Sequence, residues 1–229
     1  DEPTTENPFE IIDDEKLNNY EIDFLEKEPE FLYNAIFTML YASGIVTQYN
    51  ISANTIHSFL NETQKLYNRS QNSYHNFTHA VTVMNTCYYF LKKTPANEMF
   101  EDIGMAALLF AALMHDVDHR GNNNDYEVKA YTDLALVYNN KSVLENHHAA
   151  TAFKLLKKHE LNIFASVDSE EFNIFRTIVI ELILMTDPKH HFTHLTNLKT
   201  RIEKHGNRGC FKQSKSMDDF LLFAGSLVH

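Results

Sequence analysis

The stretch that decides the fold runs from Gly104 to His119 and reads GMAALLFAALMHDVDH. Its first eleven residues carry no polar side chain, and their Ala and Leu content favours a helix over a buried strand. A helix that is apolar on all sides must be enclosed by other parts of the chain. We therefore predict a fully buried helix from Gly104 to Met114 at the centre of the fold.

The rest of the chain supports a helical domain around this segment. It has 229 residues, of which 44% are hydrophobic, and only 6 Gly and 5 Pro. So few turn-forming residues favour long helices over a sandwich or barrel. Apolar residues recur at helical spacing in Phe31 to Tyr41, Ile56 to Tyr67 and Glu170 to Thr186, the last stopping before Pro188. We expect an all-α fold, a compact multi-helix bundle.

Charge is distributed unevenly along the chain. The net charge is -11, and the first 30 residues hold twelve acidic residues against Lys16 and Lys27. We expect an acidic N-terminal extension over residues 1–20, solvated or else bound to a partner, and a domain body over residues 21–229. The nearly neutral body offers no basic field for nucleic acid, and no apolar run is long enough to span a membrane. Without a signal-peptide pattern, the expected location is cytoplasmic.

Titratable residues follow the apolar helix directly. His115 and His119 are four residues apart, with Asp116 beside the first. His75 and His79 are also four apart, so a helix there would place both imidazoles on one face. Polar groups at the end of an apolar helix lose hydration, and a divalent cation offsets that cost well. The pattern therefore predicts a metal site.

The residue types indicate which metals would bind. Imidazole suits zinc and other transition ions, whereas a carboxylate can bridge to a harder ion such as magnesium or manganese. An adjacent His-Asp pair is therefore typical of a site for two divalent ions. For His115 and Asp116 alone, a buried hydrogen-bonded pair without metal is an equal alternative. Adding His75 and His79 favours the metal.

Four motifs in order resemble one known family: YHNFTH at 74–79, HDVDHRGNNN at 115–124, LENHH at 144–148 and TD at 186–187. They are similar to the signatures of the class I 3′,5′-cyclic-nucleotide phosphodiesterase catalytic domain, a member of the HD metal-hydrolase superfamily. The resemblance covers roughly residues 20–229, which would be the N-terminal and central part of that domain. It implies the all-α bundle of the HD/phosphodiesterase type.

The resemblance also implies a role for each site residue. His79, His115 and Asp116 would bind a zinc ion, and Asp116 would bridge to magnesium or manganese. His75 would be the general acid. Three side chains would hold water at the second ion or at the bridging hydroxide: His119, Glu145 and Thr186. Three more would shape or support the substrate pocket: Tyr74, Asn124 and Asp187. Two would support the ligands from behind or pack beside the site: His147 and His148.

The implied reaction is hydrolysis of cyclic AMP, cyclic GMP or both to 5′-nucleotides by a hydroxide that bridges the two metals. In this family a fourth ligand, an aspartate, follows a Val-His pair, which here is Val228-His229 at the end of the chain. We therefore expect the C-terminal part of the domain to be lacking, with further chain or a protein partner covering the exposed core. Two alternatives are another HD-type phosphohydrolase and a catalytically degenerate scaffold or structural subunit.

Overall fold

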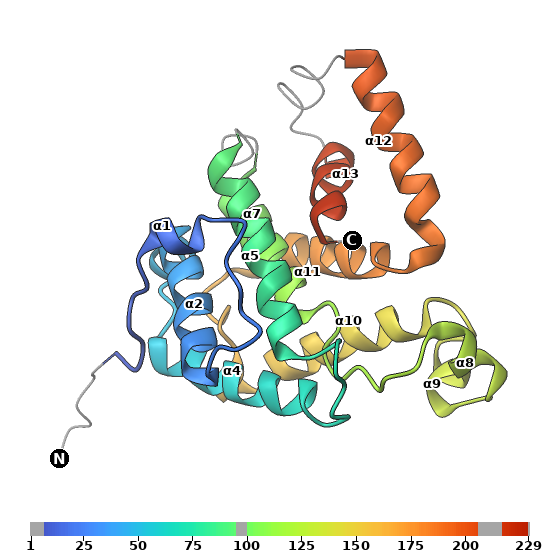
Figure 1. The fold of residues 1–229 in the computed structure, drawn as a ribbon, viewed down its shortest axis with the longest axis horizontal. Coiled ribbons are helices and arrows are strands. Elements are labelled where there is room, and N and C mark those ends of the chain that lie inside the picture. The colour runs from blue at the N-terminus through green and yellow to red at the C-terminus, as the bar shows by residue number, and fades with distance from the viewer. Residues whose placement is uncertain (1–6, 95–99, 206–216, 229) are drawn as a thin grey trace.

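The computed structural model describes residues 7–94, 100–205 and 217–228, and these form helices and loops with no strand among them. The longer helices are α2 (Pro29–Ala42), α4 (Ala53–Tyr67), α5 (Phe77–Lys93), α7 (Asp102–Met114), α10 (Val143–Leu156), α11 (Ser169–Met185), α12 (His191–His205) and α13 (Met217–Val228). The short ones are α1 (Asp14–Leu17), α3 (Ile45–Gln48), α8 (Asn124–Lys129), α9 (Asp133–Val137), η1 (His159–Leu161) and η2 (Pro188–His190). Figure 1 shows their arrangement, which confirms the all-α prediction.

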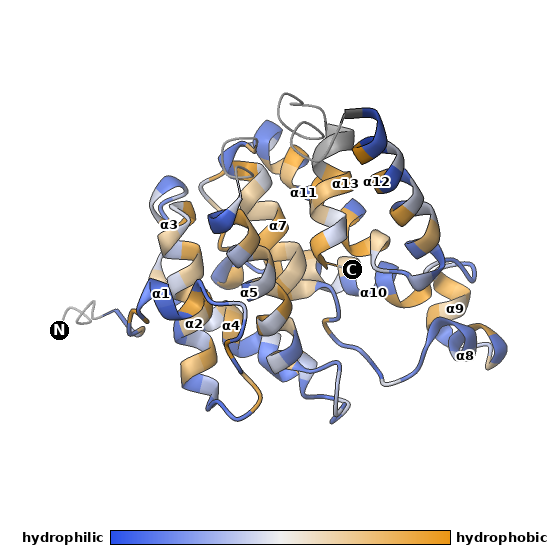
Figure 2. Ribbon diagram, turned by 45° about the horizontal axis from the view of Figure 1, so that its top comes forward, coloured by the Kyte–Doolittle hydropathy of each residue, from blue (hydrophilic) through white to orange (hydrophobic). Residues whose placement is uncertain are grey.

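Helix α7 forms the centre of the bundle, as predicted from its apolar sequence. It packs chiefly against α5 and α11, and every residue from Ile103 to Met114 except Met105 is buried. Figure 2 shows the hydrophobic residues along α7 enclosed by the neighbouring helices. Burial on all sides fixes where α7 ends, and therefore fixes the place of the polar residues that follow it.

The other predicted helices are also confirmed. The stretch Phe31 to Tyr41 lies in α2, and Ile56 to Tyr67 lies in α4. The third is α11, which begins where the Asp168 side chain accepts hydrogen bonds from two backbone N–H groups in the first turn. Its buried face carries the expected residues Phe175, Val179, Leu182 and Ile183, with Phe172 partly buried.

The described part of the acidic extension differs from the expected solvated arm. Phe9 and Leu17 are buried in the main core, and the ring of Phe9 stacks on that of Phe37 at a centroid distance of 4.4 Å. The backbone N–H of Glu10 donates to Oδ1 of Asn34 at 3.1 Å. Apolar residues among the acids therefore attach this segment to α2. Residues 1–6 lie outside the described part, and the boundary at residue 20 remains a prediction.

A small lobe projects from the bundle beside α10 (Figure 1, right side). It consists of α8 and α9, and a separate minor core joins α9 to the start of α10 through Leu134, Ala135 and Val143. Across the described ranges, no helix is both long enough and apolar enough to cross a membrane. The loop that leads into α8 starts at the end of α7, so it contains the polar residues that follow the buried helix.

A substitution in α7 tests its central place in the fold. We expect Leu108→Ala to lower the free energy of unfolding by about 2–5 kcal/mol, because the fully buried side chain leaves a cavity among close-packed helices. Urea denaturation measures the change. The control is Leu136→Ala in α9, which is 57% exposed and should change stability by less than about 0.5 kcal/mol. Equal effects of the two substitutions would contradict the central role of α7.

Candidate metal centre

The end of α7 places two candidate ligands in a polar pocket. His115 caps the C-terminus of α7 and is buried, and its Nδ1–H donates to the carbonyl of Ala112 at 2.8 Å. Nε2 of His115 therefore presents a lone pair toward the pocket. The backbone N–H of Asp116, the next residue, donates to the buried hydroxyl of Tyr67, which itself donates to the carbonyl of Leu113 at 2.8 Å. These contacts hold the turn after α7 in place.

The third candidate ligand, His79, comes from the first turn of α5. That helix begins at Phe77, and Oδ1 of its N-cap Asn76 accepts a hydrogen bond from the backbone N–H of His79 at 3.1 Å. His75 therefore precedes the helix and lies in the loop, so the suggested one-face helical placement of His75 and His79 is wrong. Asparagine is a favourable N-cap, which explains why the helix starts after Asn76. The two histidines still reach the same pocket.

The three candidate ligands converge on one point. Nε2 of His115 lies 3.2 Å from Nε2 of His79 and 3.1 Å from Oδ2 of Asp116, which is 3.4 Å from Nε2 of His79. With both Nε2 atoms deprotonated, as metal ligands must be, these lone pairs and the anionic oxygen repel one another unless positive charge lies between them. Two imidazole nitrogens and one carboxylate oxygen are also a typical zinc donor set. The residues therefore fit a divalent cation.

The electrostatics of the centre agree with this fit. Burial opposes ionisation of the Asp116 carboxyl, but the imidazoles of His115 and His79 hold its pKa well below the usual range. Burial also opposes protonation of His115, yet the adjacent carboxylate raises the pKa of that imidazole overall. A site that keeps a carboxylate ionised and raises an imidazole pKa attracts positive charge, as a metal site must.

The second oxygen of Asp116 faces another group of side chains. Nε2 of His148 lies 3.8 Å from Oδ1 of Asp116, and Nδ1–H of His148 donates to the carbonyl of Val117 at 2.7 Å. Ligand atoms of Asp116, His119 and His148 all lie within 4.8 Å of one another. Burial lowers the pKa of His148 to about 3, so its imidazole is neutral. Asp116 thus lies between two groups that could each help to hold a cation.

The expected general acid, His75, lies against His119. The two imidazole rings are stacked, with centroids 4.1 Å apart and planes inclined by only 7°. Burial lowers the pKa of both His75 and His119. The side chain of Tyr74 is exposed, and its ring lies 5.0 Å from that of His75 and 4.8 Å from that of His79.

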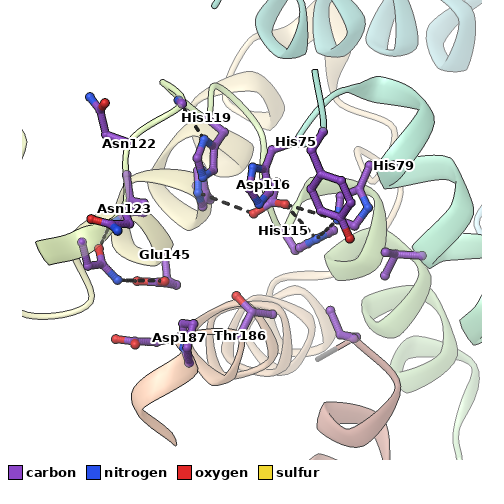
Figure 3. A pocket seen from close by; sticks show the side chains of 18 of the residues that line it. His75, His79, His115, Asp116, His119, Asn122, Asn123, Glu145, Thr186 and Asp187 are labelled. Carbon is purple, nitrogen blue, oxygen red and sulfur yellow. Dashed lines mark hydrogen bonds and ion pairs between the residues drawn. The ribbon is translucent and has the colours of Figure 1, made fainter. Parts of the chain in front are cut away.

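The far wall of the pocket is formed by α8, α10 and the end of α11. Glu145 lies in the first turn of α10, and both of its carboxylate oxygens accept from Nδ2 of Asn124, at 3.0 and 2.9 Å. Burial raises the pKa of Glu145. Thr186 caps α11, and the carboxylate of Asp187 pairs with Nζ of Lys189 at 2.6 Å. These residues supply polar oxygens opposite Asp116 (Figure 3).

The ten residues expected to bind metal or water, to donate the proton or to shape the substrate pocket all line one pocket of about 960 Å³: Tyr74, His75, His79, His115, Asp116, His119, Asn124, Glu145, Thr186 and Asp187. The pocket is also lined by Thr82, Val83 and Thr86 of α5 and by Leu227 and Val228 of α13. A volume of this size accommodates a small organic ligand. The individual roles of the ten residues remain predictions.

Two contacts beside the site were not predicted from the sequence. Asp118, which has a φ of 61°, accepts from Nη1 of Arg69 at 2.9 Å and pairs with Nε2 of His147 at 2.8 Å. His148, expected to support the ligands or to pack beside them, lines the pocket itself. Asp118 and the two adjacent histidines of LENHH are evident in the sequence, but only the folded structure shows that Asp118 contacts His147.

Comparison with known proteins agrees with this site. Residues 74–229 match the family described as 3′5′-cyclic nucleotide phosphodiesterase. The human dual specificity calcium/calmodulin-dependent 3′,5′-cyclic nucleotide phosphodiesterase 1B is 34% identical over 173 residues, which are 76% of this chain and 32% of the human protein. The Drosophila melanogaster dual specificity calcium/calmodulin-dependent 3′,5′-cyclic nucleotide phosphodiesterase 1 is 38% identical over 156 residues, 68% of this chain and 19% of the fly protein. The chain thus spans a third or less of these relatives.

The fold is also similar to that of a solved phosphodiesterase domain. The crystal structure of the phosphodiesterase domain of the RhoPDE fusion protein from the choanoflagellate Salpingoeca rosetta superposes with a TM-score of 0.86 at 32% sequence identity. The alignment covers 93% of this chain and 65% of that domain. Motifs, pocket, family match and fold all agree, and the chain belongs to the 3′,5′-cyclic nucleotide phosphodiesterase family.

Proposed function

We propose that the complete encoded protein hydrolyses 3′,5′-cyclic nucleotides to 5′-nucleotides in this pocket. The observation that carries the proposal is the convergence of His79, His115 and Asp116 on one point inside a pocket that the other motif residues line. The family match supports the substrate class. The pocket volume suits a mononucleotide, and its polar wall suits a phosphodiester.

The candidate ligands divide between two cation positions. His79, His115 and Asp116 would hold zinc, because two imidazoles and a carboxylate match its preferred donors. Oδ1 of Asp116 would reach the second position, where a harder ion such as magnesium or manganese retains water. There His119, Glu145 and Thr186 would accept from or donate to that water. When bound, the two cations would lower the pKa of water and neutralise charge on the phosphoryl oxygens.

The residues of the chain then complete the reaction. Water attacks phosphorus, the bond from phosphorus to the ribose 3′ oxygen breaks, and that oxygen needs a proton to leave. His75 would donate this proton, and its position supports the role, because it lines the same pocket and its ring lies 6.0 Å from that of the candidate ligand His79. General acid catalysis of this kind contributes roughly 10²- to 10⁴-fold to a rate. The products are a 5′-phosphate and a free 3′-hydroxyl.

The direct test is release of 5′-AMP and 5′-GMP from the two cyclic nucleotides by the complete protein with magnesium or manganese. We expect release from at least one substrate and its loss on treatment with a chelator, because chelation removes the cations that activate water. Chromatography of the products measures it. Metal-loaded protein that releases neither nucleotide would overturn the proposal. Hydrolysis of other phosphoesters alone would favour a different HD-type activity, and no hydrolysis would favour a scaffold.

Two histidine variants separate the proposed roles. His75→Ala should lower kcat for the cyclic nucleotide by about 10²- to 10⁴-fold with bound metal unchanged, because only the proton donor is removed. His115→Ala should lose both the zinc and the turnover, because a ligand is removed. Metal analysis after dialysis and steady-state kinetics give the two readouts. His159→Ala, at an exposed position in η1, is the control and should change neither.

Either of two results would contradict these assignments. Wild-type turnover in His75→Ala would exclude that imidazole as the general acid. Full zinc content in His115→Ala would exclude it as a ligand, whatever its effect on the rate.

A further inference from the structure

We infer that Asn72, in the loop between α4 and α5, is a positioning residue that fixes the imidazole of His75 for proton transfer. The inference rests on the proposed function, because it assigns Asn72 a part in delivering the proton to the leaving oxygen. It comes from the contacts of one half-buried side chain whose two polar atoms reach two different loops of the site.

The carbonyl oxygen of the Asn72 side chain holds the backbone just before α5. Its Oδ1 accepts from the backbone N–H of Tyr74 at 3.0 Å and from that of His75 at 3.1 Å. An asparagine that accepts from residues two and three positions ahead forms a local turn and fixes the path of the chain. The turn fixes the direction in which the Cα–Cβ bond of His75 leaves the loop.

The amide of the same side chain reaches the loop after α7. Nδ2 of Asn72 lies 3.2 Å from Nδ1 of His119, which also accepts from the backbone N–H of Gly121 at 3.0 Å. A backbone N–H can only donate, so Nδ1 of His119 is the acceptor and the ring proton is on Nε2. Gly121 has a φ of +86°, a backbone conformation that residues with a Cβ rarely adopt, and this conformation turns its N–H toward the ring. The glycine turn thus allows both donors to reach one ring nitrogen.

One residue therefore fixes both partners of the imidazole stack. It holds the backbone of His75 through Oδ1 and the ring of His119 through Nδ2, and the two rings lie 4.1 Å apart and nearly parallel. Within the described ranges, the imidazole of His75 makes no side-chain hydrogen bond, and its ring is held by the parallel stack on His119 and by edge contacts with Tyr74 and His79. A misplacement of about 1 Å can lower a rate by about 10²-fold.

The two loops have further contacts that do not involve Asn72. The hydroxyl of Ser70 donates to the carbonyl of His119 at 2.6 Å, and Arg69 pairs with Asp118 at 2.9 Å. These contacts should keep the loops together when the Asn72 side chain is shortened. We therefore expect Asn72→Ala to fold and to keep its metals.

The test compares Asn72→Ala with wild type on two substrates in the complete metal-loaded protein. One is the cyclic nucleotide, whose alkoxide leaving group needs a proton. The other is bis(4-nitrophenyl) phosphate, whose nitrophenolate leaves without one. We expect kcat for the cyclic nucleotide to fall by roughly 10- to 100-fold, with KM and the aryl ester rate within about threefold of wild type. Ser73→Ala, at the exposed neighbouring position, is the control and should match wild type.

An unchanged kcat for the cyclic nucleotide would overturn the inference, and so would an equal loss of rate on both substrates. Equal loss would mean that Asn72 supports the whole site rather than the proton donor. A crystal structure of Asn72→Ala gives a readout that needs no activity: the ring of His75 should leave its parallel position against His119. An unmoved ring would overturn the inference. If wild-type protein hydrolyses no cyclic nucleotide, the proposed function fails, and the ring position alone decides the role of Asn72.

Discussion

The apolar helix α7 ends where the polar pocket begins, and the site depends on that transition. Because α7 is enclosed by α5 and α11, the position of its last residue is fixed by close packing on nearly every side. The turn that follows carries His115 and Asp116, and Tyr67 hydrogen-bonds to the backbone there from α4. The central packing of the domain therefore positions the atoms that would bind a cation, which is the rigid support that a metal centre requires.

Around this fixed turn, the ends of the neighbouring helices contribute further groups. Helix α5 supplies His79 from its first turn, α10 supplies Glu145 from its own first turn, and α11 ends at Thr186. Each side chain lies at a helix terminus, where the chain changes direction and side chains from distant segments can meet. The loops before α5 and after α7 are joined to each other by polar contacts, and the imidazoles of His75 and His119, one from each loop, stack against each other.

Sequence patterns predicted the parts of this structure that depend on periodicity and on short motifs. The cores of α2, α4, α7 and α11 follow from apolar spacing, and the ten site residues came from motifs that the fold brings to one pocket. The spacing of His75 and His79 did not predict that His75 lies outside the helix. Asn76 is the N-cap, so α5 begins at Phe77, two residues after His75. The role of Asn72 depends on two loops meeting, and the packing of Phe9 depends on a tertiary contact that outweighs local charge.

The central claim is that His79, His115 and Asp116 share one divalent cation in a phosphodiesterase pocket. Anomalous diffraction from crystals of the complete protein, recorded above and below the zinc absorption edge, tests it most directly. We expect an edge-dependent peak about 2.0–2.2 Å from Nε2 of both histidines and from a carboxylate oxygen of Asp116. Zinc-supplemented crystals with no peak between these three side chains, or with zinc bound only elsewhere, would contradict it.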